Sequence, residues 1–135
     1  MVRLPDWYSR LYQLISEKEG EKFKIGQNDC TLFAADIVLA LTGEDLAEKY
    51  RGQYKTLKEG KALLEADGYS SNVDYLEKNF SEVHIAFSQA GDLGLVKVRG
   101  GFAIVAIMGG FAVGISKNGL TRYPLSEVSK VFKIG

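Results

Sequence analysis

The spacing of apolar residues changes once along the chain, near Val83, and this change restricts the fold. Before Val83, apolar residues recur every three to four positions, as they do on one face of an α-helix. After it the spacing falls towards two, and β-branched residues and glycines dominate, which is typical of strands joined by tight turns. Helices followed by an antiparallel meander predict an α+β fold, with the helices packed on the sheet.

Composition excludes several classes of protein. The chain has 135 residues, of which 46% are hydrophobic, and this size suits one domain, which we expect to span residues 1–135. Seventeen basic and seventeen acidic residues cancel, so no basic surface for nucleic acid or anionic membrane is expected. One cysteine excludes an internal disulfide, and with a single histidine we expect no metal site and no cofactor. The N-terminus lacks the apolar core of a secretion signal, and the longest apolar run, Phe102–Met108, is too short to span a bilayer.

Capping residues predict the limits of the helices. A central helix follows Asn28, which suits the N-cap position, and stops at Gly43, which suits the C′ position. Thr56 and Glu59 form the pattern of a capping box, and Ser71 or Asn72 can cap a further helix. The predicted helices are 5–19, the central helix up to 43, a short one over 44–50, one from 57 that stops at 68, and one from about 72 to 80.

Strands are predicted over 93–98, 102–108, 111–115, 120–123 and 130–134. The run 102–108 is nearly all apolar, so we expect it to be a central strand covered on both faces. Lys117-Asn118-Gly119 has the composition of a hairpin turn between two of these strands.

The central helix carries the only cysteine at its N-terminal end, and two interpretations of Cys30 stay open. Free N–H groups and the helix dipole favour a thiolate there, and a cysteine at a helix start after a glycine loop is the arrangement of papain-like nucleophiles. Against this, the neighbouring Asp29 disfavours a second negative charge. Cys30 also continues an apolar stripe of the helix and can be a small core residue. The other members of that stripe are Phe33, Ala34, Ile37, Val38 and Leu41.

A nucleophilic cysteine needs a base, and His84 is the only histidine available. It precedes the strand 93–98, and the simpler interpretation is an exposed or half-buried histidine on a connecting strand. Asp92 can orient a base or cap a turn. Asp36 can face solvent or pair with a lysine, and the turn that holds Arg51 and Tyr54 can line a pocket or be a packed turn.

Four short motifs distinguish the chain: Gly26-Gln27-Asn28-Asp29-Cys30, Leu32-Phe33-Ala34-Ala35-Asp36, Thr42-Gly43-Glu44-Asp45 and Arg51-Gly52-Gln53-Tyr54-Lys55-Thr56. Together they resemble a family of small phage and prophage proteins that are encoded near tail genes, and the likeness extends from Trp7 to Gly135. That family in turn looks like a distant relative of the NlpC-type papain-like cysteine peptidases. The peptidases share a cysteine after an aspartate at a helix start, here Asp29-Cys30, and a Gly-Asp pair opening the first strand, here Gly91-Asp92.

The chain departs from the peptidase pattern at one position. In the peptidases the second strand of the sheet begins with the catalytic histidine, followed by a short apolar run that ends in glycine. The matching run here is 102–109, and the histidine position falls at Phe102 or Ala103, neither of which can accept a proton. The resemblance therefore implies the fold more firmly than the activity.

Two functions follow from the resemblance. The first is a structural or assembly protein of a phage tail, in the tail-tip or baseplate region of the virion. It would be assembled in the host cytoplasm, bind other tail proteins and copies of itself, and contact neither nucleic acid nor the membrane interior. The alternative is a cysteine endopeptidase that acts on peptidoglycan peptides during phage entry. Cys30 would be its nucleophile, His84 its base and Asp92 the residue that orients the base.

Overall fold

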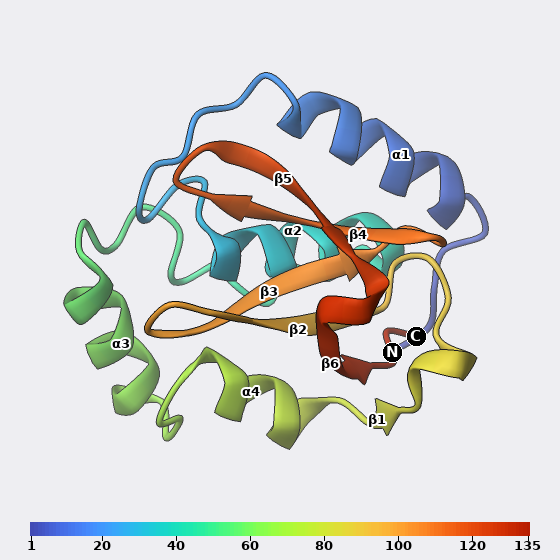
Figure 1. Ribbon diagram of the computed structural model, residues 1–135. Coiled ribbons are helices and arrows are strands. Elements are labelled where there is room, and N and C mark those ends of the chain that lie inside the picture. Colours follow the sequence, from blue (N-terminus) through green and yellow to red (C-terminus); the bar gives the residue numbers. More distant parts are fainter.

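Six strands form one antiparallel sheet in the order β1-β6-β2-β3-β4-β5 in the computed structural model, which describes residues 1–135 (Figure 1). Strands β2 to β5 are a meander, and β6 returns to pair with β2 on one side and with the short β1 on the other. Their bounds are β1 Glu82–Val83, β2 Leu93–Val98, β3 Gly101–Ile107, β4 Phe111–Ser116, β5 Gly119–Pro124 and β6 Val128–Phe132.

Four α-helices precede the sheet in the chain, so the predicted α+β class is confirmed. They are α1 Trp7–Lys18, α2 Cys30–Thr42, α3 Leu57–Ala66 and α4 Asn72–Asn79, and the single-turn helices η1 Ile85–Phe87 and η2 Leu125–Glu127 lie between strands. In Figure 1, α1 lies on the opposite side of the molecule from α3 and α4.

The strand β3 lies between β2 and β4 and is covered on both faces, as its apolar sequence predicted. Ile104 and Ala106 belong to the larger core cluster, which also contains the α2 residue Phe33. Val105 and Ile107 point to the other face and pack in a second cluster. Alternate residues of β3 therefore face α2, and this pattern decides which side chains can approach the start of that helix.

The helix α2 is buried on more than the one predicted stripe. Phe33, Ile37 and Leu41 pack in the main core as expected. In addition, Leu32 and Ala35 are buried in a third cluster, of which Ala47 and Tyr54 are members. The segment between α2 and α3 thus covers a second side of α2.

Two local predictions were wrong. The N-cap of α2 is Asp29 and not Asn28, since the Asp29 side chain accepts the bond from the Leu32 amide. Residues 44–50 form no helix: 44 and 45 are irregular and 46–50 are turns, where the Asp45 carboxylate accepts from the Ala47 amide and pairs with Arg51. Such local side-chain bonds compete with helical hydrogen bonding. The stop at Gly43 is confirmed, with φ of 81° in the left-handed region.

Asp92 connects the two ends of the chain, which lie side by side in Figure 1. Its Oδ1 accepts from the Arg3 guanidinium at 3.0 Å and from the Ile134 amide at 3.1 Å, and its Oδ2 accepts from the Gln89 amide at 2.9 Å. The Arg3 guanidinium also donates to the carbonyls of Ile134 and Ala90. Asp92 is 1% exposed, so its charge depends on these partners.

Replacing Asp92 by alanine should therefore lower the free energy of unfolding by about 3–5 kcal/mol, because the largely buried Arg3 guanidinium would lose its only charged partner. Urea denaturation measures the loss. The matched control is Lys130→Ala, whose 3.8 Å ion pairs with Glu77 and Glu82 are exposed, and which should change the free energy by less than about 1 kcal/mol. A loss for Asp92→Ala as small as that of the control would contradict this account of the chain ends.

Candidate functional site

The candidate site is the N-terminal end of α2, where Cys30 is the first helical residue. The half-buried Cys30 side chain lies beside the backbone of Ile104 in β3 and the side chain of Thr31. Tyr54 and Tyr123 are close enough that the charge of a Cys30 thiolate would raise the pKa of both phenols. The polar groups next to the sulfur are therefore the Ile104 backbone and the Thr31 side chain, and Asp29 is the charge that acts on it.

Asp29 is 4% exposed and its carboxylate has three donors. Oδ1 accepts from the Leu32 amide at 2.9 Å, which caps α2. Oδ2 accepts from the Gly26 amide at 2.9 Å and from the Tyr54 hydroxyl at 2.6 Å. One carboxylate thus fixes the helix start, the loop before it and the turn that carries Tyr54.

The surroundings of Cys30 hold its thiol in the neutral form. Burial is the largest effect and raises the pKa of Cys30, because a thiolate would lose its hydration. Polar contacts with the Ile104 backbone and the Thr31 side chain favour the thiolate, but the Asp29 charge raises the pKa further, and the net shift is upward. The thiolate that the helix dipole alone would favour is not the stable form.

The structure does not bring His84 to Cys30. His84 is exposed and caps η1, where its Nδ1 accepts from the Ala86 amide at 3.0 Å. It follows β1 at one edge of the sheet, whereas Cys30 lies against β3, and the strands β6 and β2 lie between them. Three interstrand spacings of about 4.8 Å separate β1 from β3 by roughly 14 Å, and proton transfer needs contact at about 3 Å.

Asp92 also has no contact with a candidate base. Its two carboxylate oxygens bind Arg3, Gln89 and Ile134, as described above, and none of these bonds involves His84 or Cys30. The three residues that the sequence suggested as a catalytic set therefore occupy three separate environments.

The remaining motif residues form a network of charges beside α2. Asp36 pairs with Lys18 of α1 at 2.9 Å and with Arg51 at 2.8 Å, and Arg51 also pairs with Asp45 at 3.0 Å. Lys18 is 6% exposed. Although burial by itself lowers the pKa of Lys18, its bonds to Asp36 and Glu21 outweigh that effect and raise the pKa. The pairing of Asp36 with a lysine, one of the two alternatives from the sequence, is confirmed.

Gly26 allows the two loops at this end of α2 to meet. Its φ is 84°, and a Cβ at this position would lie 2.0 Å from the carbonyl oxygen of Tyr54. The Gly26 carbonyl accepts from the Gly52 amide at 2.8 Å. The glycine of the first motif and the turn of the fourth are therefore a single packed unit, in which Tyr54 is 8% exposed.

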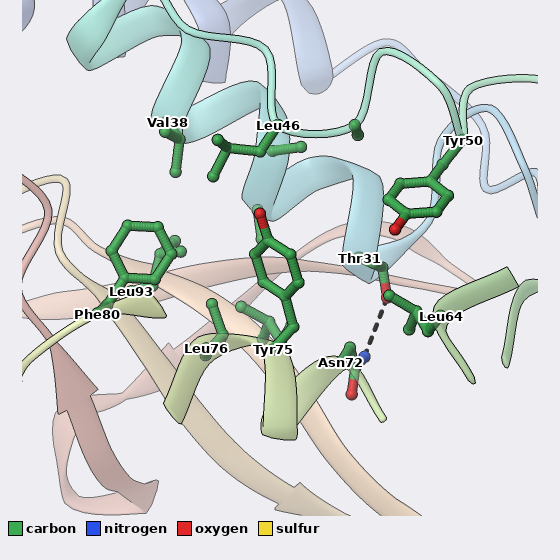
Figure 2. A pocket seen from close by; sticks show the side chains of 14 residues that line it. Thr31, Val38, Leu46, Tyr50, Leu64, Asn72, Tyr75, Leu76, Phe80 and Leu93 are labelled. Atoms are coloured by element: carbon green, nitrogen blue, oxygen red, sulfur yellow. Dashed lines mark hydrogen bonds between the residues drawn. The ribbon is translucent and has the colours of Figure 1, made fainter. Parts of the chain in front are cut away.

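An apolar cavity of about 50 Å³ adjoins Cys30, between α2, the 46–50 segment, α3, α4 and the sheet (Figure 2). It shares Thr31 and Ile104 with the surroundings of the sulfur. Fourteen residues line it and twelve are hydrophobic: Thr31, Ala34, Ala35, Val38, Leu46, Ala47, Tyr50, Leu64, Asn72, Tyr75, Leu76, Phe80, Leu93 and Ile104. The sequence did not reveal this cavity, because each of these residues by itself has the pattern of a core or turn residue.

No group of three or more His, Cys, Asp and Glu side chains is placed to hold a metal ion. None of the helices has the length and apolar character needed to cross a membrane.

A family model described as a domain of unknown function, DUF6950, matches residues 2–134. The chain belongs to the DUF6950 family. A comparison with curated proteins found no match. The match covers the helices, the sheet and both loops at the start of α2, so the site described here is part of the DUF6950 domain.

The pH dependence of Cys30 alkylation should reflect its raised pKa. We expect the rate with iodoacetamide to rise only at pH values above the ordinary cysteine pKa of about 8.5, because only the thiolate reacts. Mass spectrometry measures the rate, and Cys30 is the only cysteine of this DUF6950 chain, so the signal is specific. The control is the same chain unfolded in urea, which should react with a midpoint near 8.5. A folded-state midpoint below that of the control would show an activated thiol.

Tyr54→Phe should lower the free energy of unfolding by about 1.5–3 kcal/mol, because it removes a hydrogen bond to a buried carboxylate. Chemical denaturation measures this change. Tyr12→Phe is the matched control, since Tyr12 is 42% exposed on α1, and it should change the free energy by less than about 0.5 kcal/mol. Equal effects of the two variants would mean that the bond from Tyr54 to Asp29 contributes little to the fold.

Proposed function

We propose that this DUF6950 protein is a structural or assembly component of a phage tail, in the tail-tip or baseplate region. Its fold would resemble that of the NlpC-type peptidases but lack their full catalytic machinery. The observation that carries the non-catalytic part is that no histidine lies beside Cys30, since His84 caps η1 next to the edge strand β1. The link to phage tails is supported by the resemblance of the motifs at Gly26–Cys30, Leu32–Asp36, Thr42–Asp45 and Arg51–Thr56.

The side chains of β3 point alternately to the two faces of the sheet, and this decides which of them can face α2. Of the two positions that match the peptidase histidine, Phe102 shares with Ile104 the face of β3 that packs against α2. Ala103 shares the opposite face with Val105. Of the two positions, Phe102 is therefore the one on the face of β3 towards α2, and its side chain is 42% exposed and cannot accept a proton. Loss of general-base catalysis costs about a hundred- to ten-thousand-fold in rate.

The motif residues support a binding role as well. Side-chain contacts of four motif residues fix the loops around α2: Asp29, Asp36, Arg51 and Tyr54. Their ion pairs and hydrogen bonds stabilise the shape of this end of the molecule without requiring a reaction. A protein that presents a fixed surface to neighbouring subunits needs this kind of support.

The proposal can be tested by analysing virions and deleting the gene in a phage or prophage that encodes this chain. We expect mass spectrometry to find the protein in purified virions, and deletion of its gene to give particles with defective tails. Complementation with Cys30→Ser should restore infectivity to the level obtained with the original chain and with the exposed control Tyr12→Phe. Virions that lack the protein, together with normal tails after the deletion, would refute the proposal.

The alternative function, a cysteine endopeptidase for peptidoglycan peptides, has one observation in its favour. The Ile104 backbone and the Thr31 side chain make polar contacts that stabilise a Cys30 thiolate at the start of a helix. If Cys30→Ser abolished infectivity while the variant protein still entered the virion, this alternative would replace the structural role. His84 is too far away to act as the base, so a partner subunit would have to supply it.

A further inference from the structure

The outward face of α1 carries two large aromatic side chains, whereas the outward face of a surface helix is normally polar or charged. Tyr8 is 57% exposed, and Tyr12, one turn further along, is 42% exposed. The other exposed residues from 8 to 16 are neutral, namely Ser9, Gln13 and Ser16. In the whole chain 25% of the residues are charged, yet none of these five is. We call these five residues the α1 face; α1 lies on the opposite side of the molecule from α3 and α4 (Figure 1).

The two tyrosine rings of the α1 face are held in position by their neighbours. Their centroids lie 4.8 Å apart, and the Trp7 ring packs edge-on against Tyr8 with a centroid distance of 5.5 Å. The Arg3 guanidinium lies 4.3 Å from the centroid of Trp7 and is itself paired with Asp92. Aromatic side chains that are already ordered lose little conformational entropy on binding, and they are common at the centres of protein interfaces.

Acidic side chains flank the α1 face at both ends. Asp6 lies just before the helix, and Glu17 and Glu19 lie at its end. All three are exposed, and none of them forms an ion pair. Free carbonyl groups at the C-terminal end of a helix favour cations over acidic side chains. A basic group from outside would therefore be attracted to this end of α1.

The basic residues of α1 do not balance these charges at the surface. Arg10 points inward, where it donates to the Ala40 carbonyl at 2.7 Å. Lys18 is 6% exposed and pairs with Asp36 and Glu21. The exposed side of α1 is therefore neutral at its centre and negative at its ends.

We propose that the α1 face binds a partner polypeptide whose contact surface has aliphatic side chains at its centre and lysine or arginine at its edges. The aliphatic groups cover the two tyrosine rings, and the basic groups pair with the acidic residues at the ends of α1. An aromatic centre with few charges inside a polar rim is the usual arrangement of a protein interface. This deepens the proposed function and rests on it, in that the partner is another subunit of the tail.

The charges disfavour a second copy of the chain as the occupant. In an antiparallel pair of α1 helices, Asp6 of one copy would meet Glu17 of the other, and in a parallel pair each acidic residue would meet its counterpart. Like charges opposed across an interface weaken association. A neutral carbohydrate could stack on the two rings, but it would leave the acidic residues without a counter-charge.

NMR titration of the ¹⁵N-labelled full chain with a synthetic helical peptide tests the proposal. The peptide carries leucine at positions one turn apart and lysine at the flanking positions. We expect saturable shifts at the amides of Ser9, Gln13 and Ser16, with a dissociation constant of about 0.1–1 mM for so small a contact. The chain has no net charge, so general attraction of the lysines does not account for binding.

Two altered peptides separate the apolar contribution from the charged one. A peptide with glutamate in place of lysine should bind at least about ten-fold more weakly, because it would be repelled by the ends of α1. A peptide with alanine in place of leucine should also bind about ten-fold more weakly, because it buries less apolar surface on the rings.

Matched variants assign the binding to the α1 face. Tyr8→Ala should weaken binding of the lysine peptide about ten-fold, as loss of an aromatic residue at the centre of an interface does. Its control is Phe87→Ala, which removes a ring that is 82% exposed on η1 and should leave binding unchanged. Tyr12→Ala should act like Tyr8→Ala, and Tyr12→Phe, which retains the ring, should restore binding. The NMR spectrum of each variant reports whether it folds.

Charge reversal tests the ends of the α1 face in the same way. Glu17→Lys should weaken binding of the lysine peptide about five-fold, the size of effect expected for one charge at the rim. Its control is Glu127→Lys, at an exposed position between β5 and β6, which should leave binding unchanged.

Several results would overturn the proposal: equal binding of the glutamate peptide, equal effects of Tyr8→Ala and Phe87→Ala, or shifts confined to other parts of the chain. A dimer in analytical ultracentrifugation that Tyr8→Ala dissociates would also overturn it, since a second copy would then occupy the face. Absence of the protein from virions together with binding of the lysine peptide would remove the tail role and keep this surface. Presence in virions without peptide binding would keep the tail role and remove this surface.

Discussion

The carboxylate of Asp29 is the group on which the arrangement around α2 depends. It is buried, so it is stable there only while its donors remain in place. Those donors come from the loop before the helix, from the first turn and from Tyr54, which lies 25 residues further along the chain. The same charge raises the pKa of Cys30, because a second negative charge beside it is unfavourable. The interaction that builds this end of the helix therefore works against thiolate chemistry there.

The motifs that distinguish the chain serve its architecture for the same reason. The Asp36 carboxylate faces Lys18 on one side and Arg51 on the other, so α1, α2 and the turn before α3 meet at one residue. Loss of one partner of a buried ion pair leaves the other charge unpaired and strongly destabilises the fold. Each of these residues therefore depends on the others. A specific combination of residues at a helix start thus indicates a way of packing loops, and it does not by itself indicate a reaction.

Sequence patterns predicted the elements where local rules decide the outcome. Gly43 ends α2, one of the two predicted caps (Ser71) begins α4, and the apolar run through Val105 is a central strand, because each depends on neighbouring residues alone. The choice of Asp29 over Asn28 as N-cap was not predictable, since both are good capping residues. In the structure the Asn28 side chain binds Lys18 and Lys22, which are distant from the helix start in the sequence pattern. The separation of His84 from Cys30 could not be predicted from the sequence pattern either. It follows from the insertion of β6 between β1 and β2, which no local pattern encodes.

The cavity beside Cys30 shows a further limit of local patterns. Ala34 and Ala35 have the spacing of ordinary core residues, and only the position of α4 leaves a gap above them. The bond from Asn72 to Thr31 is the one side-chain hydrogen bond between α4 and α2, and Thr31 also contacts the sulfur. A group that enters the cavity would therefore touch residues that already border Cys30. Burial of the sulfur, which raises the pKa of Cys30, and the apolar lining of the cavity are therefore two results of the same packing of α2 against β3 and α4.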